Sequence, residues 1–279
     1  MPELPEVETV RKSLKKVILN KKIVDVEIKY NKIIKNKTDE DFRKLLIGQK
    51  FIDIKRLGKY LIFVLSDYYL ISHLRMEGKF LVRRDEAIGK HEHIIFYFTD
   101  FNLRYHDTRK FGTMHLYSKN KDIKSLVPLM NVGIEPFDSA LTIDYLEKHF
   151  SKTTRPVKST LLDQRIISGL GNIYVDEVLF LAKLNPENPT NTLSRKNISD
   201  IIKYSKLVLN KAIELGGTTI RTFSSGSEIS GRFQNELRIH TKKVCPECGQ
   251  EVIKIKVGGR GTYHCHRCQP LKRLKKTGD

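Results

Sequence analysis

The chain has 279 residues and carries 51 Lys or Arg against 32 Asp or Glu, a formal net charge of +19 at pH 7. This length suffices for one large or two modest domains, and the excess of positive charge predicts a polyanionic partner. Charged residues in the first 20 positions exclude the apolar core of a signal peptide, and no long apolar run or basic amphipathic anchor favours a membrane. We therefore expect a cytoplasmic protein that binds nucleic acid.

The first predicted element is an amphipathic helix over residues 5–19, where apolar residues recur at helical spacing. In the segment Met1–Glu6 before it, a small second residue favours removal of the initiator methionine, which leaves Pro2 as a free secondary amine. Such an amine forms an iminium cation with an aldehyde carbon, and Glu3 and Glu6 can move protons or stabilise that charge. The alternative is that the two prolines only start the helix and the glutamates complement its dipole.

Beyond this helix the apolar period changes to two, and many short strands predict an antiparallel β-sandwich with flanking helices. A short helix interrupts the strands, because Thr38 begins it and Gly48 can end it. The expected strands cover residues 24–30, 51–54, 60–65, 69–74, 80–82, 94–98, 103–105 and 114–117.

The pattern becomes helical after a linker at Gly133–Pro136. The expected helices cover residues 141–150, 157–162, 173–184 and 198–215. Gly169–Asn172 places two glycines just before a helix, where unpaired backbone N–H groups can bind a phosphate; a plain interhelical turn is the alternative. The polar, glycine-rich composition of residues 216–231 predicts a mobile lid.

All four cysteines of the chain fall into two C-x2-C pairs separated by sixteen residues: Cys245, Cys248, Cys265 and Cys268. This spacing is typical of a tetrahedral zinc site, which is structural because four thiolates leave no open coordination position. A disulfide pair is the disfavoured alternative, since no secretory segment is present. His264 and His266 could replace a ligand, although we interpret them as surface side chains. Residues 238–279 also carry eleven Lys or Arg against three Asp or Glu, so this end is an expected contact surface.

Six motifs in order resemble the formamidopyrimidine-DNA glycosylases, bacterial repair enzymes that excise oxidised purines. The motifs are Met1–Val10, Leu57–Tyr60, His73–Gly78, Asp107–Gly112, Ser168–Glu177 and the four-cysteine module with Gly258–Thr262. The resemblance spans the whole chain. It implies an α+β multidomain fold: an N-terminal catalytic β-sandwich over residues 1–130, a helix-two-turn-helix domain over 131–235 with a lesion-recognition loop at 216–231, and a zinc finger hairpin over 236–279.

The resemblance also implies a bifunctional glycosylase and abasic-site lyase in base excision repair. In such an enzyme Pro2 attacks C1′ of a damaged nucleoside, and β- and δ-elimination follow. Glu3 would protonate the ring oxygen and shuttle protons, Glu6 would support the charge of the N-terminus, and Lys59 and Arg260 would lend protons during strand cleavage. Lys59 as the amine nucleophile is an alternative that the family pattern disfavours. The expected partner is double-stranded DNA with oxidised purines or abasic sites, bound by a monomer on the nucleoid, with one structural Zn2+.

The DNA contacts implied by the resemblance fall into three groups. The phosphate ligands are Lys59, His73, Asn172 and Arg260. The residues that fill the space left by an everted base are Met76, Arg109 and Phe111. Without the resemblance, Met76 and Phe111 would be interpreted as core residues. The lesion-recognition residues are Glu77, Thr218, Arg221, Thr222 and Phe223, most of them through main-chain groups.

One departure separates this chain from the family pattern: His240-Thr241-Lys242 stands where an aromatic-Gly-Arg run is usual, which puts one phosphate contact in question. Two other functions remain open. The first is the sister enzyme that removes oxidised pyrimidines, against which Leu4 argues together with the void-filling set. The second is a non-catalytic DNA-binding protein on the same scaffold, against which the intact Pro2 and its glutamates argue.

Overall fold

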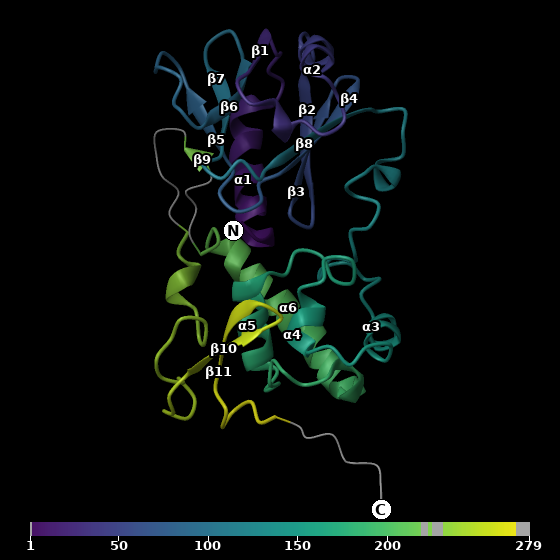
Figure 1. Cartoon of the computed structure of the whole chain (residues 1–279), viewed down its shortest axis with the longest axis vertical. Helices are drawn as coiled ribbons and strands as arrows, with labels where there is room; N and C mark the ends of the chain where they lie inside the picture. Colours follow the sequence, from purple (N-terminus) through teal and green to yellow (C-terminus); the bar gives the residue numbers. More distant parts are fainter. Residues whose placement is uncertain (1, 219–222, 225–230, 272–279) are drawn as a thin grey trace, which may run out of the picture. The chain divides into compact units, whose positions relative to one another are not determined.

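The computed structural model describes residues 2–218, 223–224 and 231–271 of the chain (Figure 1). It divides into two compact units. The first unit comprises residues 1–130 and 213–232, and the second comprises residues 131–212 and 233–279. The segment that follows the last long helix therefore belongs with the N-terminal unit.

The predicted N-terminal helix is confirmed as α1 (Leu4–Ile18). Its buried face carries apolar residues at helical spacing: Leu4, Val7, Val10, Leu14 and Ile18. The helix contacts β2 (Phe51–Leu57) and β3 (Tyr60–Leu65) of one sheet and β9 (Phe223–Ser224) of another, and in Figure 1 it lies between the labelled strands of both. Burial of one face against two sheets holds the start of α1 on a rigid support.

The first unit contains the two expected sheets. The four-stranded sheet has the order β2-β3-β4-β8, with β4 at Tyr68–His73 and β8 at Thr113–Ser118. The five-stranded sheet has the order β1-β6-β7-β5-β9. Its other strands are β1 (Asp25–Ile28), β5 (Lys79–Arg83), β6 (Glu92–Tyr97) and β7 (Asn102–His106). Among the residues that the structure describes in this unit, every strand pair is antiparallel except β5 with β9. Strand β9 was not predicted, because two residues carry no periodicity.

The unit also contains the predicted short helix, α2 (Asp39–Leu46), whose N-cap Thr38 accepts a hydrogen bond from the Asp41 N–H. Short 3-10 turns lie at Asn31–Ile33 and Ile123–Ser125. One apolar core is shared by α1, α2 and both sheets, and its largest buried side chains include Phe42, Phe63, Phe80 and Phe96. The sandwich expected from the alternating strands is therefore confirmed.

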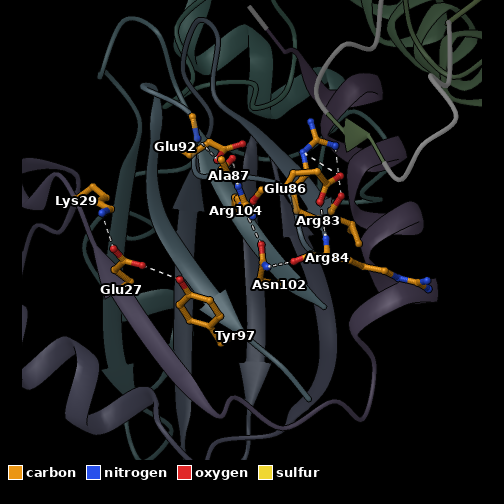
Figure 2. Close-up of polar contacts among 12 residues, drawn as sticks. Glu27, Lys29, Arg83, Arg84, Glu86, Ala87, Glu92, Tyr97, Asn102 and Arg104 are labelled. Atoms are coloured by element: carbon orange, nitrogen blue, oxygen red, sulfur yellow. Dashed lines mark hydrogen bonds and ion pairs between the residues drawn. The ribbon is translucent and has the colours of Figure 1, made fainter. Parts of the chain in front are cut away.

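A buried ion pair fastens the loop between β5 and β6 to the five-stranded sheet (Figure 2). Arg104 Nη1 lies 2.7 Å from Glu92 Oε2, and the two side chains are 3% and 6% exposed. Arg104 also donates to the carbonyl groups of Glu86 and Ala87 and to the side chain of Asn102. Although burial opposes ionisation, the guanidinium of Arg104 and the Gly89 N–H lower the pKa of Glu92. The carboxylate is thus ionised and paired at neutral pH.

The second unit contains helices and a hairpin. The helices are α3 (Ile143–Phe150), α4 (Val157–Leu161), α5 (Asn172–Leu181) and α6 (Arg195–Glu214), whose last two residues fall in the first unit. Turns of 3-10 helix lie at Thr190–Thr192 and Phe233–Asn235. The hairpin consists of β10 (Ile253–Val257) and β11 (Arg260–His264). Helix α5 ends earlier than predicted, because Lys183 has a φ of 55° that closes the helix.

Over the described part of the chain, none of the helices combines the length and apolar character that a membrane span requires.

Candidate active site

Pro2 and Glu3 form a buried entrance to α1. Glu3 is the N-cap residue in an extended conformation, and its backbone N–H donates to Glu6 Oε2 over 3.0 Å. Side chains of both glutamates are almost fully enclosed, at 2% and 3% exposure. This capping-box geometry orients the residue directly after Pro2. The two interpretations of this segment, a helix start and a catalytic site, are therefore compatible. The cap at Glu3 fixes the backbone next to Pro2, the candidate nucleophile.

Both carboxylate oxygen atoms of Glu6 accept hydrogen bonds. While Oε2 accepts from Glu3, Oε1 accepts from the N–H of Thr218 at 2.9 Å and from its hydroxyl at 3.1 Å. Gly217 makes this approach possible, since a Cβ there would lie 2.6 Å from Glu6 Oε1. The sequence placed Glu6 and Thr218 in the site but did not predict their contact. Glu6 therefore joins the start of α1 to the segment that follows α6.

Lys59 lies in a two-residue turn between β2 and β3 and is nevertheless 5% exposed. A network that the sequence did not single out connects this turn to α1. Arg56 donates to Glu8 Oε2 at 3.1 Å and to the carbonyl of Gly58 at 3.0 Å, and Arg11 of α1 makes two further hydrogen bonds to Glu8. Burial opposes ionisation of Glu8, but the hydrogen bonds and charges of both arginines lower its pKa. Glu8 thus holds the Lys59 turn against the helix that carries Pro2.

His73 ends β4 and is held as a neutral donor. Its Nδ1 accepts from the Arg75 N–H at 2.9 Å, so the ring proton resides on Nε2. Burial, reinforced by the nearby charges of Arg75 and Lys59, lowers the pKa of His73 to about 3. A neutral imidazole with an Nε2–H group can donate one hydrogen bond to a phosphate without contributing charge.

The three void-filling candidates occur in two loops of the first unit. Met76 is half-buried in the loop before β5, whereas Phe111 is 53% exposed in the loop after β7. The guanidinium of Arg109 lies over the Phe111 ring, 4.8 Å from its centroid. Because Phe111 is exposed, it is not a core residue. An exposed aromatic ring stacked with a guanidinium has the shape and chemistry that insertion between bases requires. Glu77, the lesion-recognition candidate beside Met76, accepts a hydrogen bond from Thr108.

In the second unit, Asn172 is the first residue of α5 and follows the N-cap Gly171. Its side-chain amide donates to the carbonyl of Gly261 in the β10–β11 hairpin at 2.9 Å. Arg260, which precedes that glycine, is exposed and lines a surface cavity of about 480 Å³ together with Arg155. The structure therefore brings Asn172 beside the start of β11, the strand that begins with Arg260.

A fully buried ion pair, which the sequence did not reveal, lies beneath that contact. Lys158 of α4 and Asp176 of α5 are both 0% exposed, and Lys158 Nζ lies 2.6 Å from Asp176 Oδ1. Lys158 also donates to the Gly261 carbonyl, and Asp176 Oδ2 accepts from the Tyr263 N–H. The pair thereby attaches the hairpin to two helices. The position of Asp176 inside the Ser168–Glu177 motif was the sequence feature that could have indicated its importance.

The structure gives His240, the departure from the family pattern, a defined partner. His240 Nδ1 lies 2.7 Å from Asp176 Oδ2, and the ring meets Tyr263 edge-on at 4.9 Å. The backbone N–H groups of residues 238–240 all donate to Glu177, whose pKa is raised by burial despite these bonds. Thr241 adopts a φ of 64°, the left-handed conformation that glycine favours. The turn at residues 238–241 is therefore fixed by backbone hydrogen bonds to Glu177 and by the left-handed conformation of Thr241.

The four cysteines form one cluster whose Sγ atoms all lie within 4.8 Å of one another. The Sγ atoms of Cys245 and Cys268 are 3.9 Å apart, and those of Cys248 and Cys265 are 3.4 Å apart. A tetrahedral site with Zn–S bonds of about 2.3 Å places its sulfur atoms about 3.8 Å apart. The residues therefore fit Zn2+, and neither His264 nor His266 belongs to the cluster. His266 is exposed as expected, but the expectation of a surface side chain is wrong for His264, which is buried beside the third cysteine.

Two of the predicted lesion-recognition residues, Arg221 and Thr222, lie outside the described residues. The backbone of Phe223 is described and pairs with that of Phe80 across the parallel β5·β9 contact. Thr218 is buried against Glu6.

The chain combines a two-sheet unit, a helical unit and a four-thiolate hairpin, which is the architecture of a zinc-finger DNA glycosylase. Three family models match the chain in order. They are the formamidopyrimidine-DNA glycosylase N-terminal domain over residues 1–114, the formamidopyrimidine-DNA glycosylase H2TH domain over 132–224 and the zinc finger found in FPG and IleRS over 242–271. The chain belongs to the formamidopyrimidine-DNA glycosylase family, and its cysteine cluster is the zinc site of that family's finger.

Individual relatives agree over nearly the whole length. The formamidopyrimidine-DNA glycosylase of Shouchella clausii is 47% identical and is matched over 97% of this chain and 99% of its own. That of a Bacillus cereus strain is 46% identical with the same coverage. Among solved structures, the Lactococcus lactis enzyme in complex with abasic-site DNA has a TM-score of 0.89 at 42% identity, covering 96% of this chain and 100% of that one. A mutant of that enzyme with Fapy-dG DNA has a TM-score of 0.90 at 43% identity, with the same coverage.

Proposed function

We propose that this glycosylase excises oxidised purines, both 8-oxoguanine and formamidopyrimidines, from duplex DNA and then cleaves the strand at the abasic site. Support comes from family membership and from the Lactococcus lactis enzyme, whose complexes contain Fapy-dG DNA and abasic-site DNA. The observation that carries the proposal is the buried entrance to α1, where Pro2 is followed by Glu3 and Glu6 in a capping box. A rigid secondary amine beside two carboxylates suits covalent catalysis.

The proposed reaction begins once Met1 has been removed. The nitrogen of Pro2 attacks C1′, the glycosidic bond breaks, and the base leaves with a proton. The ring-opened sugar is then an iminium ion on Pro2, which makes the C2′ hydrogen acidic. Loss of that proton expels the 3′ phosphate by β-elimination, and a second elimination expels the 5′ phosphate. Hydrolysis of the iminium releases the sugar and leaves a one-nucleotide gap.

The two carboxylates have different proposed roles. Glu3, next to the nucleophile, protonates the ring oxygen and carries protons between steps. Glu6 is occupied by hydrogen bonds from Glu3 and Thr218, so it supports the charge at the N-terminus rather than moving protons. Lys59 and Arg260 assist the departure of the phosphates as cations.

The proposed DNA contacts follow the chemistry of each side chain. His73, Asn172 and Arg260 bind phosphates and hold the duplex without reading its sequence. Met76, Arg109 and Phe111 fill the space that the everted base leaves. The loop at residues 216–231 reads the lesion, mostly through main-chain groups of Thr218, Arg221, Thr222 and Phe223, and Glu77 contributes from the loop before β5.

We propose three functional domains with boundaries near residues 130 and 235. The ranges of the three family models support this division. We also propose that the protein acts as a monomer in the cytoplasm on nucleoid DNA, as its net positive charge and its bacterial relatives suggest.

Borohydride trapping tests the proposal. Mature protein is incubated with a duplex carrying 8-oxoguanine opposite cytosine, reduced, digested and mapped by mass spectrometry. We expect the adduct on the nitrogen of Pro2 and on no lysine side chain. Full strand cleavage by Pro2→Gly would overturn the Schiff-base assignment. Trapping only on duplexes with oxidised pyrimidines would assign the chain to the sister activity, and tight binding without any adduct would identify a non-catalytic protein.

A further inference from the structure

Two loops leave neighbouring strands at the same end of the five-stranded sheet. Loop A, residues 74–78, precedes β5, and loop B, residues 107–112, follows β7. The strands are antiparallel, and Lys79 pairs with His106 at their adjoining ends. Loop A carries Met76, and loop B carries Arg109 and Phe111, so the residues proposed to enter the DNA come from two separate segments.

Both loops rest on the hydroxyl group of Tyr105, a side chain that is 0% exposed. A Cβ at Gly78 of loop A would lie 2.3 Å from Tyr105 Oη, and one at Gly112 of loop B would lie 1.6 Å from it. Real Cβ atoms essentially never approach so closely, so a side chain at either position would have to displace the buried ring of Tyr105. The base of each loop is therefore fixed against the same buried atom.

Loop B is also fixed from within by Asp107, which is 0% exposed. Its Oδ1 accepts from the Arg109 N–H at 3.0 Å, and its Oδ2 accepts from the Gly112 N–H at 2.8 Å. Loop A is closed by the Gly78 N–H, which donates to the Leu74 carbonyl at 3.0 Å. The two loops are thus well defined where they join the sheet, while their tips are exposed.

A side-chain hydrogen bond joins the exposed tips: the hydroxyl of Thr108 in loop B donates to Glu77 Oε2 in loop A. Thr108 directly precedes Arg109, and Glu77 directly follows Met76. The bond therefore fixes the spacing between the two segments next to the residues that enter the duplex. Both partners are exposed, so this hydrogen bond contributes little to the free energy of unfolding. Its effect is on the relative position of the two loop tips.

We propose that the Thr108–Glu77 hydrogen bond is a clasp that holds loops A and B in one arrangement before DNA binds, so that Met76, Arg109 and Phe111 enter the duplex together. Thr108 and Glu77 are then positioning residues. The inference rests on the proposed void-filling role of the three side chains. Its physical basis is preorganisation: ordering the loops in advance removes an entropic cost from the insertion step.

Fluorescence measures directly how fast the three side chains insert into the duplex. The probe is a duplex with 2-aminopurine opposite a tetrahydrofuran abasic analogue, mixed with the enzyme in a stopped-flow instrument. We expect Thr108→Val, which removes the hydroxyl at nearly constant volume, to slow the fluorescence change by about 5- to 10-fold. Thr108→Ser restores the hydroxyl and should restore the rate. Both variants should keep the thermal midpoint of the parent protein.

The same probe separates the clasp from lesion recognition, because the analogue has no base to recognise. Glu77→Ala should slow insertion on this duplex as Thr108→Val does, and the double variant should be no slower than either single variant. A lesion-contact role alone would leave the Glu77→Ala rate unchanged, which would overturn the clasp.

Two outcomes distinguish the clasp from the function on which it rests. If Arg109→Ala and Phe111→Ala abolish the fluorescence change while Thr108→Val matches the parent rate, void filling stands and the clasp is wrong. If Arg109→Ala and Phe111→Ala leave the change intact, these side chains do not enter the duplex, and both the void-filling role and the clasp are wrong.

Discussion

The surroundings of His73 hold its imidazole in the neutral form. Its ring is enclosed near two cations, and the Arg75 N–H occupies Nδ1. In the unfolded chain the same histidine titrates near pH 6.5. Below that pH His73 is protonated in the unfolded state, whereas in the folded state it stays neutral down to about pH 3.

This difference predicts an acid-dependent loss of stability. Because the unfolded state binds more protons between about pH 6.5 and 3, the free energy of unfolding falls as the pH drops through this window. Between pH 7 and 5 the contribution of His73 amounts to about 2 kcal/mol. Urea unfolding of the parent and His73→Gln at both pH values measures it. The loss on acidification should be smaller in the variant, and equal losses in both proteins would contradict the neutral imidazole.

At the level of secondary-structure elements, the zinc hairpin depends on helices α4 and α5. Asp176 accepts from Lys158, Tyr263 and His240, so one buried carboxylate connects three segments that are distant in sequence. The hairpin turn with Arg260 depends on this connection for its position beside Asn172.

Asp176→Asn should be strongly destabilising. The change leaves the charge of Lys158 buried without its partner, which costs about 3 to 5 kcal/mol. Urea unfolding followed by circular dichroism measures the loss. The matched control is Lys158→Met with Asp176→Leu, which removes both charges and should cost less than the single change. A single variant as stable as the parent would show that the pair is not buried in solution.

For the whole molecule, zinc determines whether the C-terminal region has a core. Cys245 and Cys265 pack with Phe180, Ile239 and Val252 in a small apolar cluster, so the metal ligands are also core residues. A region this small cannot bury enough apolar surface to fold without its metal.

Removal of zinc should therefore unfold one region selectively. After chelation, hydrogen exchange measured by mass spectrometry should increase in residues 245–268, while Leu4–Ile18 stays protected. Binding to abasic duplex should weaken, because Arg260 loses its support. Added Zn2+ should restore both properties. Unchanged exchange in residues 245–268 after complete metal removal would contradict this dependence.

The salt dependence of DNA binding separates charged phosphate contacts from neutral ones. Each phosphate neutralised by a cation contributes about −0.9 to the slope of log K against log salt concentration. Arg260→Gln should make the slope less steep by about one unit. Asn172→Ala and His73→Gln should weaken binding at every salt concentration and leave the slope unchanged, because both side chains are neutral. Fluorescence anisotropy on one abasic duplex measures all three, and a shallower slope for His73→Gln would show that this histidine binds as a cation.

Features that depend only on residues close together in the sequence were predictable from the sequence. The apolar spacing of α1 defines a helix in any context that buries one face, and the spacing of the cysteines defines a tetrahedral site within a short segment. The order of motifs also gave the family and the identity of the candidate site residues.

Only the tertiary structure decided how these residues work together. Glu6 meets Thr218 across 212 positions, and Lys158 meets the Gly261 carbonyl across 103. The two loops joined by Thr108 and Glu77 lie side by side because β5 and β7 pair, and β9 joins β5 without any periodic signal. Local sequence specifies conformational preference and chemical type. Partners this far apart are chosen by packing and by the requirement that buried polar groups be satisfied, which are properties of the folded chain as a whole.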